Sequence, residues 1–404
     1  MRRISTAGAA FACFLFASVL SAGALICAPA SAGTASAGGP PQFVTYGIGA
    51  HPQEGDPDKR QAFYFSVPAG FDKPLFVRLF DPESGGEYDQ ITTRGPNTTT
   101  RFTVFGGKGA DTSRFARPER ISHQEETLGT RLLRREFRDD PEFDNAWMTL
   151  GSVMPDQGEL VDGRYVFRLL VHGLRGHDGN VFDFAISLSE TENIPPEGLR
   201  IYSYGPTTRT PVEGLITELR FRIPDDAQSI TLGPFDGASE ETLLTQRFGT
   251  YPLAASDQNN WETTTVLLAT EDRGTYAAIT LQGGEEIPND ATFYVTDQNR
   301  KLIPFELPVR LIEPRKRPVA IGTAEDLQPC MSVRFDASGS SDPEGGALSY
   351  RWRFGDGKSA NGAIITHTYE AEGPFTAWLE VTNDSPRVGN GATVPVHVYV
   401  KRPP

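Results

Sequence analysis

The feature that most constrains the fold of this 404-residue chain is a succession of short runs of alternating or β-branched residues. Such runs cover residues 63–67, 75–80, 164–171, 181–188, 218–223, 263–269, 276–281 and 292–296. Turn-forming residues separate them, in a chain that holds 41 Gly and 31 Pro. Period-two alternation bounded by Gly, Pro, Asn and Asp is typical of β-strands, and helical periodicity is nearly absent. The sequence therefore predicts an all-β fold.

One segment departs from this pattern. Residues 114–144 are densely charged and lack clear alternation. They indicate either a short helix or a long solvated loop, and the residues alone do not decide between the two.

The N-terminus has the features of an export signal. Arg2 and Arg3 precede an apolar run at 7–28, and Ala30-Ser31-Ala32 reads as an A-x-A cleavage site. This order predicts a secretory signal peptide over residues 1–32, with an uncleaved membrane anchor as the alternative. Lipid attachment at Cys27 is disfavoured, because no small residue directly precedes it. We expect an exported protein of the periplasm, cell surface or extracellular space, with no transmembrane segment after cleavage.

The formal net charge is −14, and it becomes more negative when Arg2 and Arg3 leave with the signal. An acidic surface repels the phosphates of nucleic acids and anionic lipids, and no basic stripe interrupts it. We therefore expect no nucleic-acid partner. The same charge suits divalent cations.

Cysteine usage excludes an internal disulfide in the exported chain. Cys13 and Cys27 fall in the signal peptide, which leaves Cys330. The residues around it, 330–333, are typical of a strand, which favours a buried and inert thiol. Pairing between chains is the alternative.

The chain also contains an internal repeat. Residues 63–68, 75–82, 125–128, 144–149, 163–165 and the strand opening at Phe182 are matched in order by 219–224, 230–237, 240–243, 259–263, 274–276 and Phe293. Order-preserving similarity of this kind predicts two diverged β-sandwich units, at 43–196 and 197–312. The boundary falls at 194–198, and a Pro-rich, charged linker at 313–318 leads to a last domain.

The last domain has the most specific pattern. Tyr350, Trp352 and Phe354 alternate, which predicts a strand with one aromatic face in the core. Gly355-Asp356-Gly357 follows as a tight turn in which both glycines can take positive φ. With residues 333–345, 367–369 and 375–382, this segment resembles a PKD domain over about 316–402. The resemblance implies an immunoglobulin-like β-sandwich that serves as an interaction or spacer module, so we predict three β-sandwich domains in tandem.

Two acidic loops are candidates for calcium. Asp81, Glu83, Glu87 and Asp89 alternate along a Gly-bearing loop after a strand, and Ca²⁺ prefers six to eight oxygen ligands. The resemblance to PKD domains, some of which bind Ca²⁺ at a similar loop, suggests a second site at Asp336, Asp342 and Glu344. Solvated turns that use Asp for backbone geometry are the alternative for both loops.

No catalytic motif stands out: the chain has no G-x-S-x-G, H-E-x-x-H, phosphate-binding loop or paired-cysteine zinc spacing. His172, His177 and Asp178 are interpreted as a polar hairpin loop rather than a metal site. Tyr202, Tyr204 and Trp378 are candidates for exposed sugar platforms, whereas Trp147 and Trp261 are expected in the core.

We therefore predict a non-catalytic binding or adhesion protein of the envelope or exterior that engages a protein or polysaccharide. The alternatives are a secreted hydrolase of peptidase or glycosidase type, with the PKD-like module as an accessory, and a structural periplasmic spacer.

Overall fold

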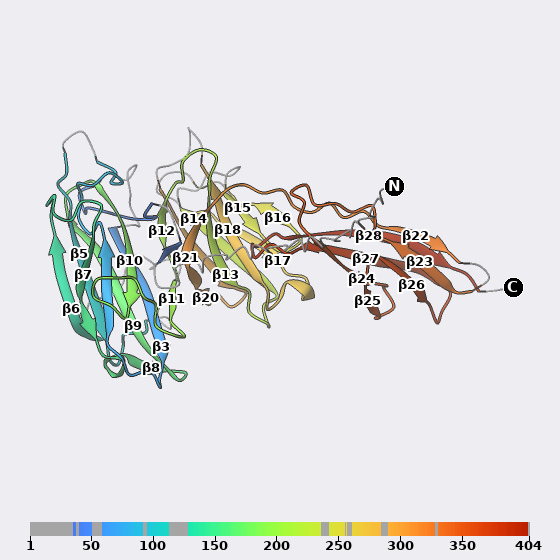
Figure 1. Cartoon of the computed structure of the whole chain (residues 1–404), viewed down its shortest axis with the longest axis horizontal. Coiled ribbons are helices and arrows are strands. Elements are labelled where there is room, and N and C mark those ends of the chain that lie inside the picture. The colour runs from blue at the N-terminus through green and yellow to red at the C-terminus, as the bar shows by residue number, and fades with distance from the viewer. Residues whose placement is uncertain are drawn as a thin grey trace, which may run out of the picture. The chain divides into compact units, whose positions relative to one another are not determined.

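The computed structural model describes residues 35–37, 40–50, 59–91, 95–112, 128–235, 242–254, 256, 261–283, 290–327 and 330–402. The predicted signal peptide lies outside these residues. Within them, all extended regular elements are β-strands, joined by two single-turn 3-10 helices (Figure 1). The predicted all-β class is confirmed.

The strands fall into three consecutive groups. The first repeat comprises β1 (Ser36–Ala37), β2 (Phe43–Tyr46), β3 (Arg60–Pro68), β4 (Leu75–Phe80), β5 (Thr99–Gly106), β6 (Thr130–Phe137), β7 (Trp147–Val153), η4 (Pro155–Gln157), β8 (Glu159–Val161), β9 (Arg164–Arg175) and β10 (Gly179–Ser187). The second comprises β11 (Arg200–Ser203), β12 (Thr207–Arg209), β13 (Ile216–Arg222), β14 (Ser229–Phe235), β15 (Thr242–Thr245), β16 (Thr250–Pro252), β17 (Thr264–Leu267), η5 (Thr270–Asp272), β18 (Tyr276–Gln282), β19 (Asp290–Asp297), β20 (Leu302–Ile303) and β21 (Phe305–Ile312). The C-terminal domain comprises β22 (Thr323–Asp326), β23 (Ser332–Asp336), β24 (Leu348–Arg353), β25 (Ser359–Asn361), β26 (Ile364–Thr368), β27 (Gly373–Asn383) and β28 (Gly391–Val400).

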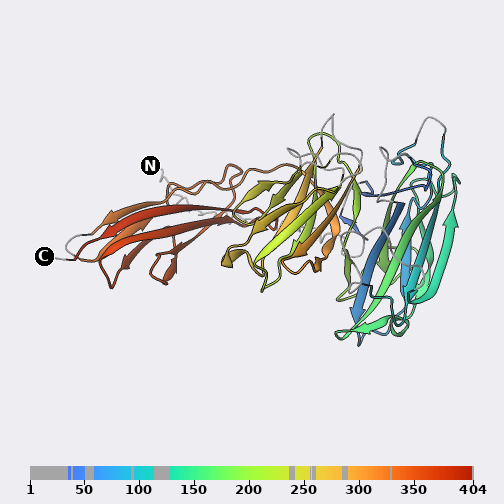
Figure 2. The ribbon, with the colours of Figure 1, turned by 180° about the vertical axis from the view of Figure 1, so that it is seen from behind.

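The two repeats have the same topology, and their sheets are continuous. In the 12-stranded sheet, β3-β9-β5-β6 of the first repeat runs one way from the central pair β11–β21, and β13-β18-β15-β16 of the second repeat runs the other. In the 9-stranded sheet, β2-β10-β4-β7 is mirrored by β12-β19-β14-β17 (Figures 1 and 2). Each strand in one arm has its counterpart in the other, which supports the predicted internal repeat. The arms meet through the antiparallel pair β11–β21 and the pair β12–β2.

Most of the matched landmarks occupy equivalent strands. Residues 63–68 lie in β3 and 219–224 overlap the end of β13, and Phe182 and Phe293 lie in β10 and β19. The match of 125–128 with 240–243 falls largely outside the described residues. The proposed boundary at 194–198 lies between β10 and β11.

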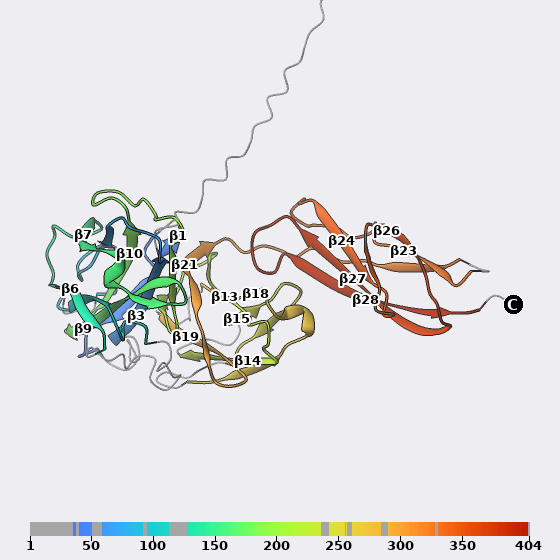
Figure 3. The same ribbon diagram turned by 90° about the horizontal axis from the view of Figure 1, so that it is seen from below.

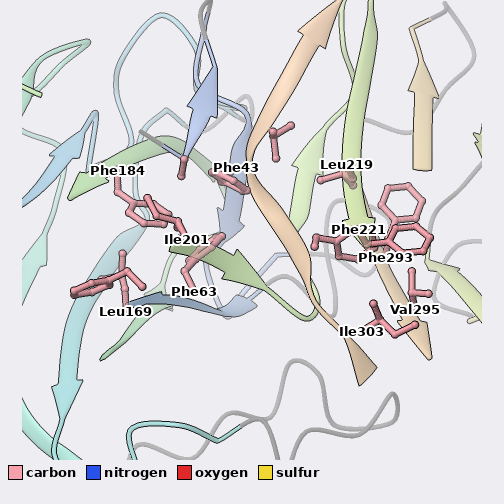
Figure 4. Packing of buried hydrophobic residues seen from close by; sticks show 14 of the residues in the cluster. Phe43, Phe63, Leu169, Phe184, Ile201, Leu219, Phe221, Phe293, Val295 and Ile303 are labelled. Atoms are coloured by element: carbon pink, nitrogen blue, oxygen red, sulfur yellow. The ribbon is translucent and has the colours of Figure 1, made fainter. Parts of the chain in front are cut away.

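Alternation along the strands explains the core between the two sheets. Phe63, Phe65 and Val67 of β3 are fully buried in one apolar cluster, together with Phe221 and Phe293 of the second repeat. Figure 4 shows side chains of both repeats in this cluster. Removal of one such side chain from water stabilises the fold by about 1.5–3 kcal/mol. The repeats therefore share a core.

The C-terminal domain has its own core between the sheets β22-β23-β26 and β25-β24-β27-β28 (Figure 3). Trp352 and Phe354 are buried there, as the alternation predicted, and Gly355 and Gly357 have φ of 82° and 86°. The ring of His367 stacks on Phe354 at 3.9 Å between centroids, and its Nε2 lies 2.8 Å from Asp356 Oδ2.

Three expectations from the sequence are wrong. The charged segment 114–144 contains strand β6 where a helix or loop was expected, while its residues 114–127 lie outside the described part. β6 forms one edge of the 12-stranded sheet, where charged side chains remain solvated. Cys330 is exposed and precedes β23, and its backbone N–H donates to the carbonyl of Leu327.

The segment from His172 to Asp178 is also not a hairpin. β9 continues to Arg175 in one sheet, and β10 begins at Gly179 in the other, so the connection crosses between the layers. Asp178 is buried and accepts a hydrogen bond from the backbone N–H of Asn97 at 2.8 Å.

Candidate functional site

A row of polar and aromatic side chains crosses the outer face of the 12-stranded sheet where the repeats meet. Arg220, Glu306, Tyr202, Tyr64 and Arg168 are successive cross-strand partners on β13, β21, β11, β3 and β9. The phenol rings of Tyr64 and Tyr202 are stacked at 5.2 Å with an interplanar angle of 11°. This row brings together residues of both repeats.

Burial keeps the two tyrosines of this row uncharged. Tyr64 is fully buried beside Thr112, and burial raises the pKa of Tyr64 to about 12. Burial also raises the pKa of Tyr202. Arg168 donates to the carbonyl of Leu128 at 2.7 Å and lies over a phenylalanine ring of β5 at 4.7 Å.

Beside the row lies a groove of about 720 Å³. Its lining includes the side chains of Asp111, Arg164, Arg200, Tyr202, Tyr204, Arg222, Tyr276 and Glu306. Arg164 is fixed by donation to the carbonyls of Ser66 and Gly198, at 2.8 and 2.5 Å. The groove thus combines an aromatic wall with charges of both signs. Such a surface offers apolar contact, hydrogen bonds and ion pairs to a bound chain.

The structure separates the residues of the first predicted calcium loop. Asp81 and Glu83 are fully buried, Asp89 is half-buried and Glu87 is exposed. Asp89 closes the loop, because its carboxylate accepts from the backbone N–H groups of Gly85, Gly86 and Val181 at 2.7, 3.1 and 2.6 Å. Among the described contacts, none brings a carboxylate oxygen of Glu87 into the buried part of the loop.

Sequence reasoning missed the residues that face this loop. β7 pairs with β4, so the connection from β6 to β7 approaches the loop that follows β4. This connection brings Asp144 and Asp139 toward Glu83. All three carboxylates lie around Gly85: an alanine methyl at this position would be 2.8 Å from Asp139 Oδ1 and 3.2 Å from both Asp144 Oδ1 and Glu83 Oε2. The only sequence feature that could have indicated these two residues was the acidic run at 139–144.

The buried carboxyls hold protons strongly. Burial raises the pKa of Glu83 to about 9, with a further increase from Asp144. Burial raises the pKa of Asp81 and of Asp89 to about 7. In the described part of the chain, no group of three or more His, Cys, Asp or Glu side chains forms a ready-made metal centre.

The three acids of the predicted C-terminal site are satisfied by donors of the protein. Asp336 accepts from the N–H of Ser338 at 2.9 Å. Asp342 accepts from Glu344, Gly346 and Asn383 at 3.0, 3.2 and 3.0 Å. Glu344 pairs with Arg315 at 3.0 Å. These hydrogen bonds hold the pKa of Asp336 and of Asp342 below its usual range.

The aromatic candidates also differ in exposure. Trp378 is exposed, whereas Tyr202 and Tyr204 are half-buried against Tyr64. Trp147 and Trp261 are half-buried and pack on Phe80 and Phe235, with ring centroids 5.5 and 5.3 Å apart. No helix in the described residues is long and apolar enough to cross a membrane.

Comparison with known proteins identifies the last domain. The PKD domain family matches residues 315–398. The pre-pro-metalloprotease PrtV of Vibrio cholerae is 27% identical over 134 residues, which cover 29% of this chain and 15% of PrtV. Collagenase ColA of Clostridium perfringens is 38% identical over 53 residues, covering 13% of this chain and 5% of ColA.

The chain thus spans only a small part of the length of these relatives. Among solved structures, the PKD1 domain of Vibrio cholerae PrtV is 30% identical, with a TM-score of 0.19, over 21% of this chain and 99% of that domain. The match to the family model shows that residues 315–398 are a PKD domain, an immunoglobulin-like β-sandwich.

Proposed function

We propose that this chain is an exported, non-catalytic binding protein that engages an extended polypeptide in the groove between its two repeats. The groove carries the proposal: Tyr202 and Tyr204 form an apolar wall, and Arg200, Arg222 and Glu306 supply charges of both signs. A polypeptide presents the same mixture of apolar and charged side chains, together with backbone groups for hydrogen bonding.

Two further observations support this proposal. The PKD domain resembles modules of proteins named as a metalloprotease and as collagenases, which suggests an extracellular protein as partner. The N-terminal residues 1–32 have the order of charged, apolar and small residues that directs export. Periplasmic, surface-bound and released forms are all compatible with that signal.

The test is retention of ligands by the immobilised full chain. We expect binding of gelatin or of extended peptides, and weaker binding after Arg200→Glu, because this exposed arginine lines the groove. Lys73→Glu is the matched control, since Lys73 is exposed on the turn before β4 and lies outside the groove.

Three outcomes would contradict the proposal. Equal loss of binding in both charge-reversal variants would place the ligand elsewhere. Retention of polysaccharides alone would change the ligand class. Shortening of the peptide during incubation would favour a hydrolase.

A further inference from the structure

A cluster of buried carboxyl groups lies where the loop after β4 meets the loop before β7. Four carboxylate oxygens in this region have no hydrogen bond of normal geometry within the described part of the chain. They are both oxygens of Asp81, Oε1 of Glu83 and Oδ1 of Asp144. All of these atoms are inaccessible to solvent, and Asp81 and Glu83 are fully buried. A buried acceptor without a partner is costly, and a buried carboxylate is more so.

The backbone N–H of Asp140 donates to Glu83 Oε2 at 3.3 Å, but no basic side chain of the described residues neutralises these groups. Asp81, Glu83 and Asp144 take part in none of the salt bridges among the described residues. Two species can make such a cluster stable, a proton shared between carboxyl groups or a bound cation.

Two glycines let the carboxylates approach the backbone of this loop closely. An alanine methyl at Gly86 would lie 2.4 Å from Asp81 Oδ2, and one at Gly85 would lie 2.8 Å from Asp139 Oδ1 and 3.2 Å from Glu83 Oε2. Acidic oxygens from both loops therefore pack directly against these two glycines. Asp89 keeps the loop in this shape through its hydrogen bonds to Gly85 and Gly86.

We propose that Asp81, Glu83 and Asp144, with Asp139 at the rim, bind a divalent cation of the calcium type that ties the loop after β4 to the loop before β7. Hard carboxylate oxygens from two loops are the ligands that Ca²⁺ prefers, and its flexible coordination tolerates an irregular cage. Because the carboxylates surround the glycines without meeting at one point, binding draws them together. Glu87 has no part in this site, and Asp89 positions the loop.

Calcium titration of the full chain, after removal of metal with a chelator, tests this proposal. We expect binding of roughly one ion at this site, with a higher melting temperature in CaCl₂. In the double variant Asp81→Asn with Glu83→Gln, calcium affinity should fall by roughly 100-fold or more, because affinity depends on the number of charged ligands. At alkaline pH the metal-free variant should melt at or above the temperature of the metal-free wild type, since neutral amides replace carboxyl groups that would be charged and buried.

Three controls separate this site from others. Glu87→Gln should leave affinity unchanged, and so should Asp342→Asn, which alters only the loop of the PKD domain. Gly86→Ala should weaken binding because the methyl would displace the Asp81 carboxylate, whereas Gly70→Ala, with nothing within 4 Å of its added methyl, should not.

Other results would overturn the proposal. These are the absence of any heat or thermal shift at millimolar CaCl₂, or an unchanged response in the Asp81→Asn, Glu83→Gln variant. In either case a proton occupies the cluster. A response lost only with Asp342→Asn would place the cation in the PKD domain.

Discussion

Tyr64 of the first repeat stacks on Tyr202 of the strand that opens the second, with ring centroids 5.2 Å apart. These residues are also direct partners in the pairing of β3 with β11. The junction between the repeats is therefore built from the same backbone pairing and ring contacts as the interior of each repeat.

Shared sheets and a shared core predict that the repeats unfold together. Phe63→Ala and Phe221→Ala remove fully buried rings from the same cluster, one in each repeat. Each should cost about 3–5 kcal/mol of the free energy of unfolding. Differential scanning calorimetry should show both substitutions shifting the same transition. Two separate transitions, each responding to one substitution, would contradict a common core.

The PKD domain should melt independently of the repeats, because its buried cluster is a separate one. Trp352 is the largest side chain in that cluster and is fully buried. Trp352→Ala should destabilise the domain by about 3–5 kcal/mol and leave the transition of the repeats in place. Limited proteolysis should then cleave the variant within 315–398 first. Trp378→Ala is the matched control, since Trp378 is exposed.

The β-strands and the repeat could be predicted because alternation and turn residues are local signals. The joining of the sheets could not be predicted from the sequence. The paired strands β11 and β21 lie about a hundred residues apart in the chain, and each strand alone would fit the edge of an ordinary sandwich. The charged strand β6 was missed because an edge strand needs little apolar surface.

The acidic site was predicted in part for the same reason. Asp81 and Glu83 were evident from their spacing along one loop. Asp144 was not, because its approach to them depends on the pairing of β4 with β7. Glu87 fits the alternating pattern as well as its neighbours do, and only its exposure separates it from them.

The exposed position of Cys330 predicts reactivity in the folded chain. Because its side chain is accessible just before β23, a thiol reagent should modify it without denaturant. We expect complete reaction of native protein with Ellman's reagent and, under oxidising conditions, a disulfide-linked dimer on non-reducing gels. Cys330→Ser should abolish both and leave the melting temperature unchanged. Reaction only after unfolding would show a buried thiol.

The acidic cluster predicts how stability depends on pH in the metal-free chain. Burial raises the pKa of Asp81 and Asp89 from 3.8 to about 7, and that of Glu83 from 4.5 to about 9. The folded chain therefore keeps these protons at pH values where the unfolded chain has lost them. Their contribution to stability is fully present below the unfolded pKa values and is lost as the pH rises through about 7 and then about 9.

Urea unfolding in a chelating buffer should therefore show a free energy of unfolding that falls between about pH 5 and pH 9. The Asp81→Asn, Glu83→Gln variant should show a shallower fall, because only Asp89 of the three still titrates. Calcium should stabilise the wild type more at pH 8.5 than at pH 6, since the cation competes with the protons for the same oxygens. A wild-type profile as shallow as that of the variant would mean that these carboxyl groups are ionised and solvated in the folded chain.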